Sequence, residues 1–176
     1  MEEFKSIAEL TKMDEKHVLL GCVRGFVPDL EGRHRHISEI NLHTGVPDTI
    51  RGQFNVARNM ALYQYFFYAL AQEVQLKTYT IIEMALRQRA GSCKKPRLSD
   101  LLQKAASNGW LSDSRFRHIE KPVGSNPYCR SLPDVLPNLR NEAAHGSSRL
   151  DWNCIQDLEI CADLVNQLFE CPAAYV

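Results

Sequence analysis

The 176-residue sequence has no excess of charge, because Lys+Arg and Asp+Glu each total 21. This balance argues against a protein that binds polyanions through bulk charge, although it leaves room for a local basic groove. No apolar run reaches about 18 residues, so we expect no membrane-spanning helix. The acidic start lacks the apolar segment of a signal peptide, which predicts a cytoplasmic location. A chain of this length is expected to bury a core without help from disulfides or metal.

Several sequence signals of common sites are also missing. The six cysteines form no C-x-x-C pair and no zinc-knuckle spacing, so we expect them to be small buried side chains and predict no metal site. There is no G-x-S-x-G, no P-loop and no G-x-G-x-x-G. We therefore expect neither a classical hydrolase nor a protein with a bound cofactor.

Glycine and proline are both missing between Gly52 and Gly91, and residues 49–90 are predicted to be helical. As one straight helix, the roughly 38 residues between these two glycines alone would be about 57 Å long. A compact domain of this size is only about 40 Å across. The stretch must therefore kink, break into two helices, or extend along a second subunit, for which the apolar residues 60–71 offer a surface.

Two more helices are predicted by apolar periodicity, over residues 98–106 and 151–169. Proline is tolerated only near a helix start, so Pro133 and Pro137 predict that the regular part of another helix begins at residues 134–137. Together these segments predict an all-α, up-and-down bundle of about five helices.

The predicted helical domain covers residues 46–176, and residues 1–45 form a less regular N-terminal extension. The extension contains Arg33-His34-Arg35-His36, the densest cationic cluster in the chain. This cluster is either a solvated loop or an arm that contacts a phosphate backbone. In the second interpretation Arg33, Arg35 and His36 are substrate-binding residues.

Residues 139–146, with the sequence Leu-Arg-Asn-Glu-Ala-Ala-His-Gly, hold the candidate site. Asn141 and His145 are four residues apart, and so share one helical face, with Arg140 beside them. Gly146 is placed as the residue that ends a helix. The residue types suit phosphate chemistry, because arginine binds phosphate and histidine transfers protons near neutral pH.

This segment, between long upstream helices and a final helix, resembles the signature of the HEPN superfamily, which is Arg, a polar residue, a short spacer and His. The upstream segment that contains Glu83 and Arg87 resembles the second long helix of that family. The resemblance implies a homodimeric, metal-independent endoribonuclease with two motifs facing each other. It implies that Arg140 holds the phosphate, Asn141 orients the reacting groups and His145 transfers protons, which leaves a 2′,3′-cyclic phosphate. Glu83 and Arg87 are further candidates for substrate binding.

Ser147 departs from the family members that are controlled by modification, which commonly carry Tyr at this position. The resemblance suggests a defence or toxin role, with RNA as substrate and an antitoxin or defence protein as partner. Three alternatives to this function remain. In the first, the domain binds RNA or nucleotides without cleavage, and in the second it is a dimerisation module. In the third, the motif has only a structural role: Arg140 pairs with a carboxylate such as Glu142 or Asp134, and His145 caps a helix.

Overall fold

The computed structural model describes residues 3–24, 29–91, 96–145 and 153–170. These residues form seven α-helices and two short 3-10 turns, and none of them lies in a strand. The all-α prediction is confirmed, but the expected number of about five helices is too low. The extension contributes two helices, and the long helical stretch contributes two rather than one. The helices are α1 (Glu15–Arg24), α2 (Leu30–Glu39), α3 (Asp48–Tyr63), α4 (Leu70–Ala90), α5 (Leu98–Ser107), α6 (Pro127–Ala144) and α7 (Cys154–Phe169).

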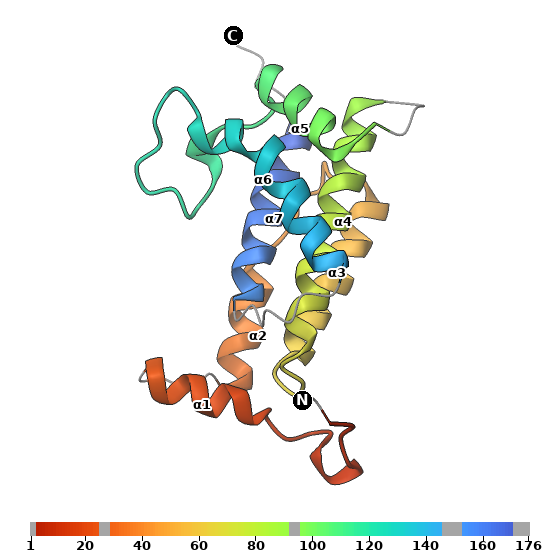
Figure 1. Ribbon diagram of the computed structural model, residues 1–176, viewed down its shortest axis with the longest axis vertical. Coiled ribbons are helices and arrows are strands. Elements are labelled where there is room, and N and C mark those ends of the chain that lie inside the picture. Colours follow the sequence, from red (N-terminus) through yellow and green to blue (C-terminus); the bar gives the residue numbers. More distant parts are fainter. Residues whose placement is uncertain (1–2, 25–28, 92–95, 146–152, 171–176) are drawn as a thin grey trace.

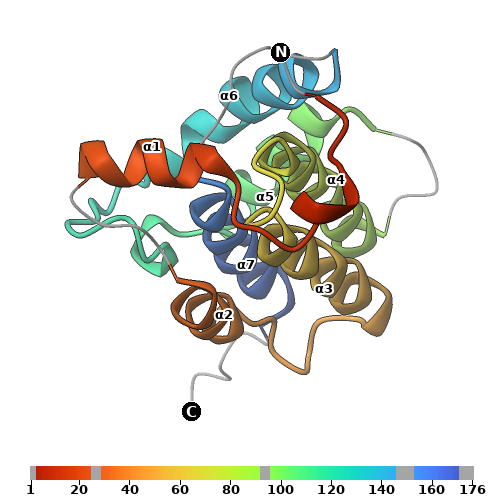
Figure 2. The ribbon, with the colours of Figure 1, turned by 90° about the horizontal axis from the view of Figure 1, so that it is seen from below.

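Helix α4 is the centre of the bundle. It packs against α3, α5, α6 and α7, which surround it when the molecule is seen from below (Figure 2). Its buried residues point in several directions around the helix, as the nearly continuous apolar sequence predicts: Ala71, Val74, Ile81, Ile82, Ala85 and Leu86. Helices α3, α4 and α7 lie side by side along the longest axis, and α6 crosses the face formed by α4 and α5 (Figure 1).

The long helical stretch breaks into two helices, one of the three outcomes expected from its length. Buried polar groups hold the break between α3 and α4. The backbone N–H of Tyr68 donates to Asp14 Oδ2 at 2.9 Å, and Gln64 Nε2 donates to the Tyr68 carbonyl at 3.3 Å. Gln64 is 1% exposed. These two bonds give partners to backbone groups of Tyr68 in the turn, as burial of polar groups requires.

Residues 33–36, for which a solvated loop was one interpretation, lie within helix α2. Asp29 is the N-cap of this helix and accepts a hydrogen bond from Gly32 N at 2.6 Å. Ile37 and Ile40 are 5% and 0% exposed and belong to the core. The end of the N-terminal extension is therefore packed as firmly as the helices that follow it.

Helix α6, which carries the candidate motif, begins at Pro127, earlier than its two internal prolines predict. Pro127 occupies the first turn, where a missing N–H costs nothing. The carboxylate of Asp113, only 1% exposed, accepts hydrogen bonds from the next two backbone N–H groups, Tyr128 at 3.0 Å and Cys129 at 2.9 Å. This capping from outside the helix supports its start, so Pro133 and Pro137 lie inside it.

No helix in the described ranges is both long and apolar enough to cross a membrane.

Candidate functional site

The motif residues lie at the exposed C-terminal end of α6. Arg140 Nη1 donates to Asn141 Oδ1 at 3.3 Å, and the side chain of Arg140 is 44% exposed. His145 follows the last helical residue, and its backbone N–H donates to the Asn141 carbonyl at 3.0 Å. The motif therefore closes a helix, as expected. Gly146, predicted to end it, and Ser147 lie outside the described residues.

A carboxylate on α4 links the motif to a second arginine. Glu83 Oε1 accepts from Arg87 Nη2 at 2.5 Å, and Glu83 Oε2 lies 3.8 Å from Arg140 Nη2. The partner of Arg140 is thus Glu83, not Glu142 or Asp134. Four of the predicted site residues come together from two helices, and one carboxylate between two guanidinium groups leaves an excess of positive charge. We call Glu83, Arg87, Arg140 and Asn141 the arginine cluster.

The imidazole of His145 is exposed. Within the described part of the chain, no hydrogen bond or ion pair fixes the orientation of its ring. A histidine that transfers protons usually has its second nitrogen held by a neighbour. Within the described residues of one chain this orienting contact is missing, whereas Arg140 is already held by Glu83 and Asn141.

The second predicted group, on α2, is not part of the arginine cluster. Arg33 is buried, Arg35 is exposed, and His36 Nε2 lies 3.1 Å from Glu159 Oε1 of α7. Figure 2 shows α2 and α6 on opposite sides of the core formed by α3, α4 and α7. The structure therefore does not bring these three residues together with Arg140, and any contact they make with a ligand occurs elsewhere.

Two contributors to these sites were not predicted from the sequence. Asp113 positions the motif helix from the preceding loop, and the cavity that contains Arg33 also includes His17, Tyr68 and Cys154. No local spacing indicates either arrangement, because the partners are far apart in sequence. Burial of Asp113 opposes its ionisation, but hydrogen bonds from Cys129 and Tyr128 lower its pKa below the ordinary value.

Comparison with known proteins identified no matching family model, curated protein or solved structure. Among the residues that the structure describes, no group of three or more His, Cys, Asp or Glu side chains is arranged to hold a metal ion.

Proposed function

We propose that this protein is a metal-independent endoribonuclease of the HEPN type, which cleaves RNA at a site formed by two copies of the chain. The observation that carries the proposal is the arginine cluster beside His145. Two guanidinium groups that share one carboxylate retain positive charge at an exposed helix end, where a phosphate can reach them. At the same helix end lies the imidazole of His145, which makes no hydrogen bond or ion pair with the described residues.

The proposed reaction needs only positioning, proton transfer and charge stabilisation. The ribose 2′-oxygen attacks the adjacent phosphorus, and the bond from phosphorus to the 5′-oxygen breaks. His145 of one copy removes the 2′-hydroxyl proton, and His145 of the other copy gives a proton to the leaving oxygen. Arg140, supported by Arg87, stabilises the charge that develops on the phosphoryl oxygens. The products are a 2′,3′-cyclic phosphate and a 5′-hydroxyl.

The surface next to the motif supports assembly of two copies. Val135 and Leu139 are 46% and 38% exposed, and they are four residues apart on α6. Apolar side chains on one face of a solvent-facing helix favour contact with another protein surface. A pair of such helices would bring two His145 residues near each other and would supply an orienting contact that the described residues of one chain do not provide.

A defence or toxin role follows from the same exposure. An uncovered ribonuclease site endangers the RNA of its own cell, so the proposal includes an antitoxin or defence-system partner that covers the end of α6.

The second candidate is a module that binds RNA or nucleotides, or forms dimers, without cleavage. One observation favours it, because no described residue orients the ring of His145. In this alternative the arginine cluster binds phosphate and no bond is broken.

The deciding experiment incubates the purified full chain with total RNA and transfer RNA in excess chelator. His145→Ala is expected to reduce cleavage by about 10²–10⁴-fold, and His34→Ala, which removes another exposed histidine, should not. Arg140→Ala and Arg130→Ala form a second pair, because both arginines are exposed on α6 and only Arg140 belongs to the cluster.

Substrate controls test the chemistry directly. An RNA with a 2′-deoxy nucleotide at the mapped cut site should resist cleavage, and the products from unmodified RNA should end in cyclic phosphate. RNA binding without cleavage would support the module instead. Cleavage that survives His145→Ala, or cuts the 2′-deoxy substrate, would refute the proposed mechanism. Light scattering shows whether the active form is a dimer, and a strictly monomeric active enzyme would contradict the two-copy site.

A further inference from the structure

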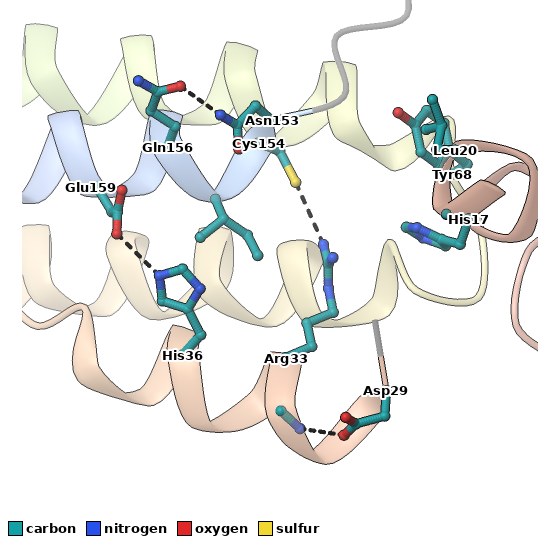
Figure 3. Close-up of a pocket in the computed structure, with 13 residues that line it drawn as sticks. His17, Leu20, Asp29, Arg33, His36, Tyr68, Asn153, Cys154, Gln156 and Glu159 are labelled. Carbon is teal, nitrogen blue, oxygen red and sulfur yellow. Dashed lines mark hydrogen bonds and ion pairs between the residues drawn. The ribbon is translucent and has the colours of Figure 1, made fainter. Parts of the chain in front are cut away.

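A cavity of about 590 Å³ lies between α1, α2, the start of α7 and the turn that joins α3 to α4. Figure 3 shows Arg33 rising from α2 into this space, with Cys154 opposite it and His17 and Tyr68 at one side. The cavity is within the size range of small-molecule sites, about 300–1,000 Å³. It shares no lining residue with the arginine cluster, so a ligand bound here would be separate from the proposed ribonuclease site.

Arg33 is a buried cation that pairs with no carboxylate among the described residues. It is 8% exposed, and its Nε and Nη2 donate to the Ala61 carbonyl at 2.9 and 2.7 Å. Nη2 also donates to Gln64 Oε1 at 2.6 Å and lies 3.6 Å from Cys154 Sγ. The Ala61 carbonyl and the Gln64 side-chain oxygen are neutral acceptors. In the part of the chain that the structure describes, Arg33 pairs with no carboxylate and its Nη1 has no hydrogen bond.

The neutral partners only partly compensate this charge. The Ala61 carbonyl belongs to the last turn of α3, whose partial negative charge is about half an elementary charge. Burial lowers the pKa of Arg33 below its ordinary value, because desolvation disfavours the charged form. A buried charge is normally paired, and leaving it unpaired costs several kcal/mol by order of magnitude. An anion in the cavity would supply the missing charge.

The start of α7 provides a second feature that attracts anions. Asn153, Cys154, Ile155 and Gln156 line the cavity at the N-terminus of this 16-residue helix. The Asn153 side chain donates to Gln156 Oε1 and makes no cap hydrogen bond to the backbone. Helix N-termini bind phosphate and carboxylate groups through their free N–H groups and dipole. The guanidinium of Arg33 and this helix end thus lie at the same cavity.

The two carboxylates of the lining already have partners. Asp29 caps α2 through Gly32 N, and Glu159 pairs with His36 at 3.1 Å (Figure 3). Glu159 also lies 3.8 Å from Arg117 Nη1. Glu159 thus has cationic neighbours of its own, and Asp29 lies at the N-terminus of α2, so neither carboxylate is paired with Arg33. The cavity is larger than a single phosphate or carboxylate group, and Leu20, Tyr68 and Ile155 provide apolar surface for the rest of a larger ligand.

We propose that this cavity binds a small phosphorylated molecule, with the phosphate between Arg33 and the N-terminus of α7 and the rest of the ligand against Leu20, Tyr68 and Ile155. Phosphate fits better than a carboxylate, because it has more oxygens and a larger negative charge to place between the guanidinium and the positive end of α7.

The test is a titration of the full-length protein with inorganic phosphate, in which binding is measured by ³¹P NMR and by calorimetry. The ionic strength is kept constant with chloride. An Arg140→Gln background removes the more exposed guanidinium of the arginine cluster and leaves Arg87 paired with Glu83, so phosphate binding measured there is independent of the ribonuclease proposal. In this background Arg33→Gln should weaken phosphate binding by about 10- to 100-fold, the value of one or two hydrogen bonds to a charged group. Arg35→Gln is the matched control, because Arg35 is an exposed arginine on the same helix and does not line the cavity.

A second variant keeps the test decisive if Arg33→Gln does not fold. Glu159→Gln removes a negative charge from the cavity wall and retains an oxygen for His36, so phosphate should bind several-fold more tightly. Equal affinity in the parent and Glu159→Gln proteins, no saturable phosphate binding, or equal weakening by Arg33→Gln and Arg35→Gln would each overturn the proposal. Tighter binding of phenyl phosphate than of inorganic phosphate, with phenol not binding, would support the apolar part of the site.

Discussion

The hydrogen bonds between Asp113 and α6 predict a large loss of stability in the Asp113→Ala variant. Pro127 has no N–H, so Tyr128 and Cys129 provide the first two backbone donors of the helix, and both donate to Asp113. Alanine removes both acceptors. The donors then depend on whatever water can reach a position where the native side chain is 1% exposed.

The magnitude follows from the value of each bond. A hydrogen bond to a charged group contributes roughly 1.5–3 kcal/mol, and solvation of the released N–H groups recovers a part of two such bonds. We therefore expect a loss of about 3 kcal/mol in the free energy of unfolding. For a chain of this size, each kcal/mol shifts the melting temperature by about 2–4 °C. The expected decrease is about 6–12 °C.

The pH dependence gives a second sign to check. The pKa of Asp113 is lowered in the folded protein, so its contribution is fully present above the unfolded value, about 3.9, and disappears as the pH falls through the folded value. The difference between wild type and Asp113→Ala, measured by thermal unfolding, should therefore decrease at acid pH. Asp134→Ala, an exposed aspartate on α6, is the control. A decrease below about 2 °C at pH 7, or one equal to that of the control, would refute the capping argument.

Three further predictions follow from single contacts. Glu83→Gln should increase the affinity for an RNA oligonucleotide in fluorescence anisotropy, because Arg140 loses the carboxylate that offsets its charge, and weaker binding would contradict this. Burial raises the pKa of Cys129 to about 12 and raises the pKa of Cys161 still further. Neither thiol should therefore react with Ellman's reagent at pH 8 until the protein unfolds. Labelling of either cysteine in the native protein, detected by mass spectrometry, would contradict this prediction. Burial lowers the pKa of His17 in the folded protein, so as the pH falls the His17 side chain is protonated in the unfolded chain before it is protonated in the folded one. The wild type should therefore lose more stability than His17→Gln between pH 7.5 and 5.5. Equal losses in the two proteins would contradict this prediction.

The parts of the fold that depend on local periodicity could be predicted from the sequence. The ends of α5 and α7 lie within three residues of the expected positions, because their apolar stripes have helical spacing. The break between α3 and α4 was only one of three predicted outcomes. Its position depends on Asp14 and Gln64, and Asp14 is about 50 residues away from the turn it caps, so no local signal locates the break.

The arrangement of the candidate site was predicted in part. The helix end that presents Arg140, Asn141 and His145 follows from their spacing, and the structure adds Glu83 as the partner of Arg140. The start of α6 could not be predicted, because proline statistics describe a helix by itself and take no account of a cap such as Asp113. The burial of Arg33 was missed for a related reason. A run of arginine and histidine suggests a solvated segment, but on a helix only every third or fourth side chain faces inward.

Arg140 and Arg33 differ in how strongly solvent and salt screen their charges, and this difference allows the two proposals to be tested separately. Arg140 is 44% exposed, so mobile ions screen its attraction for RNA over a Debye length of about 8–10 Å. RNA binding there should weaken steeply with salt, since phosphate contacts release counterions. Arg33 is 8% exposed and donates to fixed neutral acceptors, so ions screen its attraction much less. Phosphate binding in the cavity should therefore persist at a chloride concentration that removes RNA from α6. If both interactions weakened in parallel with salt, phosphate would be bound at the surface, and the buried charge of Arg33 would be compensated by the end of α3 alone.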